Sequence, residues 1–446
     1  MNVLLIAIDT LRADHLSCYG YSRLTSPRID RLASQGVRFV SCFSPHIPTH
    51  PAFTTLHTGV DVFQHQVVAH GGTVEPDRSI PLLAEVLKAR GFLTVSVDNL
   101  GRWFTRGFDA VLPYRWSTDP TAAWRKAEAV NAQALTALDL VAGQSRPWFL
   151  FVHYWDPHTP YLPPPPFDRM FYGGDPFDPT NRSMEPVFAF EPFRAYFEQW
   201  MGGVTDIRFP VAQYDAEIAY VDTALEHLLG RLSELGLDEE TLIVLVADHG
   251  EVMDEHEGYF DHHGLYDANV RVPLILRLPE RLPAGRVVDA FVQLFDVAPT
   301  ILDLIGASDV PRDLGMIGRS VLPLIDGAPG VDAIYLTECT WMRKRGLRTD
   351  RWKLIRALEP DFHNLPPVQL FDLAADPAEQ RNLADDLPNT VRDLTARLDD
   401  WVERRRAQTG KPDPLEEQQI THRRIGQMKA AVPADRKLYA EGGRAE

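Results

Sequence analysis

Short runs of apolar residues, each of strand length, recur along the chain and constrain its fold more than any other feature. They cover Val3–Ile8, Leu93–Val97, Trp148–His153, Leu242–Ala247 and Val272–Leu276. Apart from Leu93–Val97, which contains Thr94 and Ser96, these runs do not alternate between apolar and polar residues, and this is typical of strands buried on both faces. Helical patterns lie between them, at residues 26–35, 80–89, 119–141 and 211–235. Strands that alternate with helices predict an α/β fold, in which a mostly parallel sheet carries helices on both faces.

The pattern changes after about residue 318. Short strands are expected at residues 333–338, 345–349 and 352–357, followed by a helix over residues 389–405. We therefore expect a main domain over residues 1–319, a small C-terminal α+β domain over 320–402 and a charged tail over 403–446. The tail is expected to wrap another surface or to mediate homo-oligomerisation.

Residues 162–210 interrupt the main domain with a loop-rich insertion that contains the Pro163–Pro166 run and several aromatic residues. A long insertion beside a central strand often covers a pocket. The alternative is a surface excursion with a small apolar cluster of its own.

The charge balance excludes several classes of partner. The 446 residues include 45 Lys and Arg against 62 Asp and Glu, which gives a formal net charge of −17. Because this charge repels phosphate backbones and anionic lipid heads, neither nucleic acid nor a membrane surface is expected as a partner. An anionic substrate would need a local positive centre, and a metal ion supplies one.

The cysteines and the N-terminus indicate a location. Cys18, Cys42 and Cys339 are far apart and predict neither a disulfide framework nor a thiolate zinc site. The N-terminal apolar run is too short for a signal peptide or a membrane span. We therefore expect a soluble, cytoplasmic protein.

Chemically active side chains follow directly on the predicted strands, where open sheets of this kind bind ligands. Asp9 ends the first run, and Asp248 and His249 end the fourth. Gly250 permits a turn in which these two adjacent side chains converge. Carboxylate and imidazole ligands together suit Mn²⁺ or Zn²⁺ better than Mg²⁺. Taken singly, each of these residues is equally well read as an ordinary turn residue.

Two further segments carry candidate groups. Thr49 lies just before a helix that starts with Pro51, where a hydroxyl faces the positive end of the helix dipole, although a plain N-cap has the same pattern. Histidines gather at residues 153–158 and 255–263. Such clusters predict metal or anion chemistry, whereas a lone histidine there would be an ordinary turn residue. The second segment is not an HExxH zinc helix, because its spacing is wrong and it contains glycines.

These segments, in this order, resemble the motifs of the sulfatase family of the alkaline phosphatase superfamily. The resemblance spans about residues 2–402. It is carried by Ile8–Asp14, Thr49–Gly59, Asp156–Tyr161, Tyr214–Ile218, Asp248–Glu251, Val270–Leu274, Arg348–Ile355 and Asp376–Leu383. It implies an alkaline-phosphatase-like fold and a metal-dependent ester hydrolase.

The resemblance also implies a metal site. Asp9, Asp248 and His249 match metal ligands, and Thr49 matches the nucleophile, which also touches the metal. We expect one divalent ion, with Mn²⁺ or Zn²⁺ favoured and Ca²⁺ or Mg²⁺ as alternatives. A second ion is a further alternative, held by Asp215 together with His256, His262 or His263.

Other residues match positions that contact the substrate. His158 matches a residue that touches the transferred anion or the leaving-group oxygen. His262 falls where many members carry a Lys that holds the anion, and His263 lies one position further on. Asn99 appears near where many members have another Lys, and Thr10 stands where many have a second Asp ligand.

The nucleophile segment departs from the sulfatase pattern. Sulfatases carry Cys or Ser in the frame Cys/Ser-x-Pro-x-Arg and oxidise it to formylglycine. Here the frame runs from Thr49 to Phe53. Threonine cannot give formylglycine, because its extra methyl group blocks an aldehyde, and Phe53 replaces the Arg that supports the aldehyde hydrate.

Threonine nucleophiles occur elsewhere in this superfamily, in nucleotide pyrophosphatase/phosphodiesterases and in phosphoethanolamine and lipoteichoic acid transferases. The resemblance therefore favours a hydrolase of small-molecule phosphate esters, either diesters or phosphonate monoesters. Thr49 would attack phosphorus, His158 or His262 would stabilise charge or protonate the leaving oxygen, and water would cleave the phospho-threonine. Two alternatives stay open, namely a sulfatase that acts without formylglycine and a catalytically silent member that binds a ligand.

Overall fold

The computed structural model describes the chain except residues 71, 115–125, 362 and 418–446. A nine-stranded sheet forms its centre, in the order β10-β2-β8-β7-β1-β6-β4-β5, with β9 beside β2. The strands are β1 (Asn2–Ile8), β2 (Val37–Phe43), β4 (Leu93–Val97), β5 (Ala110–Val111), β6 (Trp148–Tyr154), β7 (Thr241–Ala247), β8 (Arg271–Arg277), β9 (Arg286–Val288) and β10 (Val292–Gln293).

All five predicted strands of the main sheet are present, and the sheet is mostly parallel. Strands β7, β1, β6, β4 and β5 run parallel to one another, whereas β8 is antiparallel to both of its neighbours, β7 and β2. Every residue of β1, β6 and β7 is buried, as expected for strands covered on both faces.

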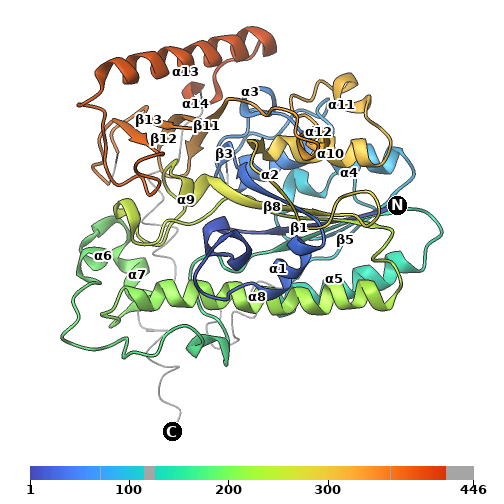
Figure 1. Cartoon of the computed structure of the whole chain (residues 1–446), viewed down its shortest axis with the longest axis horizontal. Coiled ribbons are helices and arrows are strands. Elements are labelled where there is room, and N and C mark those ends of the chain that lie inside the picture. The colour runs from blue at the N-terminus through green and yellow to red at the C-terminus, as the bar shows by residue number, and fades with distance from the viewer. Residues whose placement is uncertain (71, 115–125, 362, 418–446) are drawn as a thin grey trace.

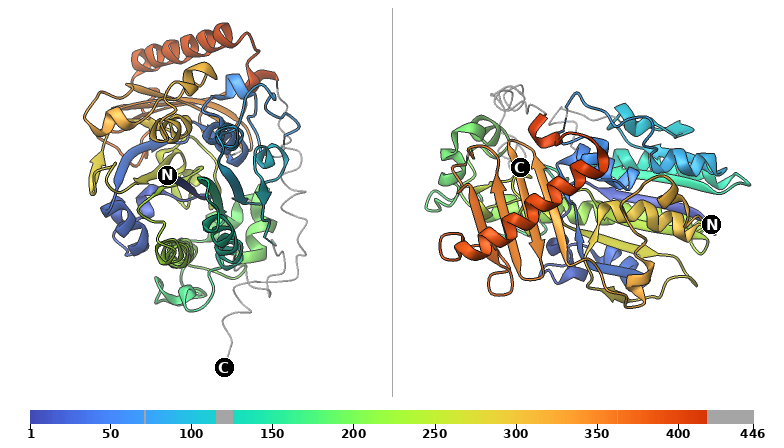
Figure 2. Two further views of the ribbon diagram at one scale, coloured as in Figure 1. Left: turned by 90° about the vertical axis from the view of Figure 1, so that its right-hand side faces the viewer. Right: turned by 90° about the horizontal axis from the view of Figure 1, so that it is seen from above.

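Helices cover both faces of this sheet, as predicted (Figures 1 and 2). One face carries α1 (Pro27–Ser34), α5 (Lys126–Ala142) and α8 (Arg208–Glu234). The other carries α2 (Thr49–Thr58), α4 (Leu83–Ala89) and α10 (Val297–Leu304). The first residues of the helix predicted at 119–141 lie outside the described part of the chain. The short helices are α3 (Val62–His65), α6 (Glu185–Ala189), α7 (Arg194–Met201), α9 (Asp267–Val270), α11 (Val310–Asp313) and α12 (Leu322–Ile325).

A second, five-stranded sheet has the order β14-β13-β12-β11-β3. Its strands are β11 (Ala333–Cys339), β12 (Arg343–Thr349), β13 (Trp352–Ala357), β14 (Val368–Asp372) and β3 (His46–Ile47). The strands predicted at residues 345–349 and 352–357 are present within β12 and β13, which pair antiparallel. The helix α13 (Pro388–Thr409) lies across this sheet (Figure 2), and α14 (Pro414–Glu417) follows it. The rest of the predicted tail, residues 418–446, lies outside the described residues.

The strand β3 comes from the N-terminal part of the chain, and it pairs in parallel with β11. It ends two residues before Thr49, so the segment that leads into α2 is held by the second sheet. The two sheets therefore meet where the candidate nucleophile lies.

The insertion at 162–210 is part of the main core and not a separate cluster. Met184, Val187, Phe197 and Trp200 are buried and belong to the same core as the central strands. Among the described residues, no helix is long and apolar enough to cross a membrane.

Candidate active site

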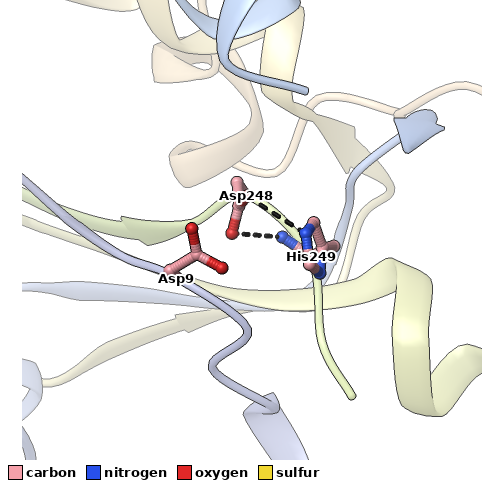
Figure 3. A group of neighbouring side chains, drawn as sticks. All are labelled: Asp9, Asp248 and His249. Atoms are coloured by element: carbon pink, nitrogen blue, oxygen red, sulfur yellow. Dashed lines mark hydrogen bonds and ion pairs between the residues drawn. The ribbon is translucent and has the colours of Figure 1, made fainter. Parts of the chain in front are cut away.

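The carboxyl ends of β1 and β7 bring three predicted residues together. Ile8 lies opposite Ala247 in the parallel pair, so Asp9 and Asp248 leave the sheet side by side. With His249 they form a group whose ligand atoms all lie within 4.8 Å of one another (Figure 3). All three side chains are fully buried. The predicted convergence of Asp248 and His249 is confirmed.

This group fits a divalent cation. Asp9 Oδ1 and Asp248 Oδ2 are buried and accept no hydrogen bond. Such oxygens are costly to bury unless a cation or a donor satisfies them. Burial, followed by the neighbouring Asp9 carboxylate, raises the pKa of Asp248, and a bound cation would favour the charged form of this group. Two carboxylate oxygens and one imidazole nitrogen suit Mn²⁺ or Zn²⁺.

His249 is oriented by the main chain. Its Nδ1 lies 2.9 Å from the carbonyl oxygen of Gly250, which can only accept, so Nδ1 carries the hydrogen. In a neutral ring Nε2 would then present the lone pair that ligates a metal, and this nitrogen lies 3.3 Å from Asp248 Oδ2 and 3.2 Å from Thr49 Oγ1.

Thr49 lies at the N-terminus of α2 as predicted, although the helix begins at Thr49 itself and not at Pro51. The N–H groups of the first helical turn have no partners within a helix, and the helix dipole places positive charge there. Its hydroxyl therefore lies between a helix N-terminus and the Asp9–Asp248–His249 group. This position suits both a developing alkoxide and an anionic substrate.

His153 lies beside Asp9 and orients its carboxylate. Its Nε2 lies 3.3 Å from Asp9 Oδ2, and its Nδ1 lies 2.9 Å from Asp98 Oδ1. Burial lowers the pKa of His153, but the hydrogen bonds to the two carboxylates outweigh it and raise the pKa to about 9. Burial likewise raises the pKa of Asp9, yet His153, His158 and His249 together hold it well below its usual range.

Two further predicted histidines lie beside the group. The ring centroids of His249 and His262 are 4.8 Å apart, and those of His158 and His262 are 5.4 Å apart. Nδ1 of His158 lies 2.7 Å from the carbonyl oxygen of Thr159 and so carries its hydrogen. Asn99 reaches this region only indirectly, because its amide oxygen accepts a hydrogen bond of 2.7 Å from Trp155, whose ring packs 5.8 Å from that of His158.

His263 points elsewhere, which corrects its prediction as a substrate contact. It lies in a buried cluster in which Nδ1 is 2.9 Å from Glu338 Oε1 and Nε2 is 3.2 Å from Lys344 Nζ. Adjacent residues in an irregular loop face different ways, and here only His262 faces the candidate nucleophile's side.

The ligand set predicted for a second ion is not brought together. Asp215 is hydrogen-bonded to His15, Tyr21 and Arg23. His256 stacks on Tyr266 at 3.6 Å between ring centroids. A different acid–histidine group is present instead, formed by Glu251, Asp261 and His262.

Sequence reasoning missed the support that His153 and Asp98 give to Asp9, and it missed the pairing of His50 with His70. His153 and Asp98 orient Asp9, and Asp98 follows directly on β4, so the rule for strand ends that identified Asp9 would also have identified it. His50 stacks on His70 at 4.1 Å between ring centroids, a pair that no sequence signal indicates.

The fold and the site together define an alkaline-phosphatase-like hydrolase with a candidate metal group. Residues 1–307 match the family described as Sulfatase, and residues 254–408 match N-sulphoglucosamine sulphohydrolase, C-terminal. The chain therefore belongs to the sulfatase family of the alkaline phosphatase superfamily, and it is an ester hydrolase.

Relatives of two kinds resemble the chain over most of its length. The multifunctional alkaline phosphatase superfamily protein PehA of Trinickia caryophylli is 26% identical, and the match covers 90% of this chain and 95% of PehA. The phosphonate monoester hydrolase of Agrobacterium radiobacter superposes with a TM-score of 0.70 at 25% identity, covering 92% and 96% of the two chains. The N-acetylglucosamine-6-O-sulfatase of Bacteroides thetaiotaomicron is 23% identical, covering 86% and 82%.

Proposed function

We propose that this protein hydrolyses small phosphate esters, either diesters or phosphonate monoesters, with Thr49 as the nucleophile and a divalent ion at Asp9, Asp248 and His249. The observation that carries the proposal is the 3.2 Å distance between Thr49 Oγ1 and His249 Nε2, at the N-terminus of a helix. Residues 1–319 contain all of these groups and are the proposed catalytic domain.

Each side chain has a distinct task in this proposal. The ion, with Mn²⁺ or Zn²⁺ favoured and Ca²⁺ or Mg²⁺ as alternatives, supplies Lewis acidity and a lower pKa for the attacking hydroxyl. Thr49 attacks phosphorus, and the first N–H groups of α2 face the charge that develops on the substrate oxygens. His158, whose Nδ1 hydrogen is held by Thr159, is the proposed donor to the leaving oxygen, which it would protonate from Nε2 as an imidazolium and so become neutral.

The surroundings of Phe53 favour phosphate over sulfate chemistry. This side chain is fully buried, and its ring meets that of His153 edge-on at 4.7 Å and that of Phe151 at 6.1 Å. An aromatic cluster thus fills the place where formylglycine sulfatases carry an Arg. A sulfo-threonine ester also lacks an easy elimination route, so a sulfatase that uses Thr49 would turn over slowly.

A sulfatase acting without formylglycine is nevertheless a second candidate, because the relatives include sulfatases. A silent binding protein is disfavoured, since a silent site has no reason to keep two buried carboxylate oxygens without hydrogen bonds.

The insertion at 162–210 is proposed to set the choice of leaving group. The hydroxyl of Tyr196, on α7, lies 3.0 Å from Thr159 Oγ1, next to His158. The insertion therefore touches the loop that carries the proposed proton donor.

Turnover of paired substrates tests the proposal. Purified protein loaded with Mn²⁺ or Zn²⁺ is assayed with bis-p-nitrophenyl phosphate, p-nitrophenyl phenylphosphonate and p-nitrophenyl sulfate. We expect turnover of a phosphorus ester that disappears in Thr49→Ala and persists in Thr136→Ala, a matched change at an exposed position of α5. Sulfate turnover that survives in Thr49→Ala would show that the nucleophile is wrong.

A further inference from the structure

A second group of metal-ligand side chains lies beside the first. It consists of three ligand atoms that all lie within 4.8 Å of one another, one each from Glu251, Asp261 and His262. A local antiparallel bridge holds the two acids together, because Val252 N–H donates to Asp261 O at 2.8 Å and Asp261 N–H donates to Val252 O at 3.1 Å. Both carboxylates are fully buried.

The buried carboxylate of Glu251 indicates where a cation would bind. Both of its carboxylate oxygens are buried and lack a hydrogen bond of good geometry, and the polar groups beside them are the His262 ring and the Tyr161 hydroxyl. Nδ1 of His262 is 3.8 Å from Glu251 Oε1, beyond hydrogen-bond distance. The Arg12 guanidinium binds the main-chain oxygen of Glu251 and the side chain of Glu255, and not the Glu251 carboxylate. A buried carboxylate in this state is strongly unfavourable unless a cation balances it.

Hydrogen bonds hold the Asp261 carboxylate in a position from which it can ligate the same cation. Its Oδ2 accepts a hydrogen bond of 2.5 Å from Trp341 Nε1, and its Oδ1 accepts one of 2.9 Å from the main-chain N–H of His262. Each oxygen keeps a second lone pair. Nδ1 of His262 lies 3.5 Å from Asp261 Oδ1, so the same ring nitrogen faces both acids.

We propose that Glu251, Asp261 and His262 bind a second divalent cation next to the Asp9–Asp248–His249 group. The rings of His249 and His262, one from each group, are 4.8 Å apart. The two ligand sets have the same composition, two carboxylates and one imidazole, so the same ions, Mn²⁺ and Zn²⁺, suit both. In two-metal hydrolases, neighbouring ions share one substrate.

The second site also gives His262 a defined protonation state. An imidazole that ligates a metal through Nδ1 is neutral and carries its hydrogen on Nε2, on the other side of the ring. His262 would then donate a hydrogen bond to a substrate oxygen from Nε2. This last step rests on the proposed function, whereas binding of the second ion does not.

Metal stoichiometry tests the site without any substrate. Chelator-treated protein is titrated with Mn²⁺ calorimetrically, and bound metal is counted by mass spectrometry after desalting. We expect two ions per chain in the wild type, and half of that in Glu251→Gln and in Asp9→Asn. Glu257→Gln, the same change at an exposed position of the same loop, should keep both ions. A single ion in the wild type, or a stoichiometry that Glu251→Gln leaves unchanged, would overturn the proposal.

Two further measurements keep the test decisive. If circular dichroism shows that Glu251→Gln does not fold, Asp261→Asn takes its place, with the same expected halving. Two neighbouring Mn²⁺ ions couple magnetically, so the fully loaded wild type should lose the electron paramagnetic resonance pattern of isolated Mn²⁺. Persistence of that isolated pattern at full loading would contradict adjacent sites. Because no ester is present, failure of the proposed hydrolysis and failure of the second site are distinguishable.

Discussion

Nε2 of His153 lies 3.3 Å from Oδ2 of Asp9, in a pair from which solvent is excluded on all sides. Since Nδ1 of the same ring faces Asp98 at 2.9 Å, both ring nitrogens carry hydrogens and the imidazole is a cation. One oxygen of Asp9 is thereby held, and the other, Oδ1, has no hydrogen-bond partner and is available as a ligand.

This relationship predicts a weaker metal site when the support is removed. His153→Gln should lower Mn²⁺ affinity by about 10–100-fold, because residues that orient a ligand typically contribute that much. Asp98→Asn should act in the same direction with a smaller effect. Calorimetric titration of chelator-treated protein measures both, with His227→Gln on the exposed side of α8 as the control. Unchanged affinity in His153→Gln would mean that Asp9 is held by other contacts.

Position 49 should tolerate serine, which keeps a hydroxyl group, but not valine, which has the shape of threonine without the hydroxyl. Thr49→Ser keeps Oγ at the start of α2 and should retain measurable turnover, whereas Thr49→Val should lose at least about 10³-fold in kcat. Acid quenching during turnover of bis-p-nitrophenyl phosphate, followed by peptide mass spectrometry, should place one phosphoryl group on Thr49. A phosphoryl group found on another residue, with Thr49 unmodified, would refute covalent catalysis by Thr49.

Phe53 should matter for stability because it is packed among aromatic rings. Phe53→Ala should cost about 3–5 kcal/mol of unfolding free energy, as is usual when a buried Phe is truncated. Urea unfolding measures the change, with Phe177→Ala, at a partly exposed position that is 37% accessible, as a control. A loss below about 1 kcal/mol would show that this cluster is loosely packed and has room for a larger polar group.

The Asp206–Arg208 pair at the start of α8 should make stability depend on pH in the acidic range. The hydrogen bond from Arg208 lowers the pKa of Asp206 to about 2, below its ordinary value, so its contribution is complete at neutral pH and is lost as the pH falls. Since Arg208 is largely exposed, we expect Asp206→Asn to cost about 1 kcal/mol at neutral pH. The gap between variant and wild type should shrink below about pH 4. A gap that stays constant with pH would show that the charge of Asp206 contributes nothing.

The link between the insertion and the proposed proton donor can be tested at Tyr196. Tyr196→Phe removes the hydrogen-bonding group that meets Thr159 and should change KM by about 5-fold, the equivalent of one ordinary hydrogen bond. The effect should differ between substrates with different leaving groups. Equal kinetics for all substrates would argue that the insertion has no part in specificity.

The central strands and the first metal group follow from the sequence because both depend on local pattern. Strands buried on both faces are continuous apolar runs, and the residue after each run emerges at the ligand-binding edge. The strand β2 was not predicted, since Arg38 and Ser41 interrupt its apolar pattern where the strand is only partly buried. The strand β14 was likewise not predicted, since Gln369 and Asp372 interrupt its apolar pattern.

The rest of the site depends on tertiary packing that no local pattern encodes. Glu338 and Lys344 of the second sheet bind His263 and turn it away from the first metal group. His262 is therefore the histidine that lies beside His249. Asp215 has the residue type of a metal ligand, yet the packing of α8 against the N-terminal segment pairs it with His15, Tyr21 and Arg23.

The parallel pairing of β3 with β11 has a consequence for how the protein is made. His46 and Ile47 leave the ribosome early, but the strand that they pair with follows near the end of the chain. During vectorial synthesis the segment just ahead of Thr49 must wait, unpaired, until β11 emerges. The segment that leads into Thr49 therefore cannot be completed before β11 is made, and a nascent chain stalled before residue 333 would hold the first metal ligands without a finished nucleophile.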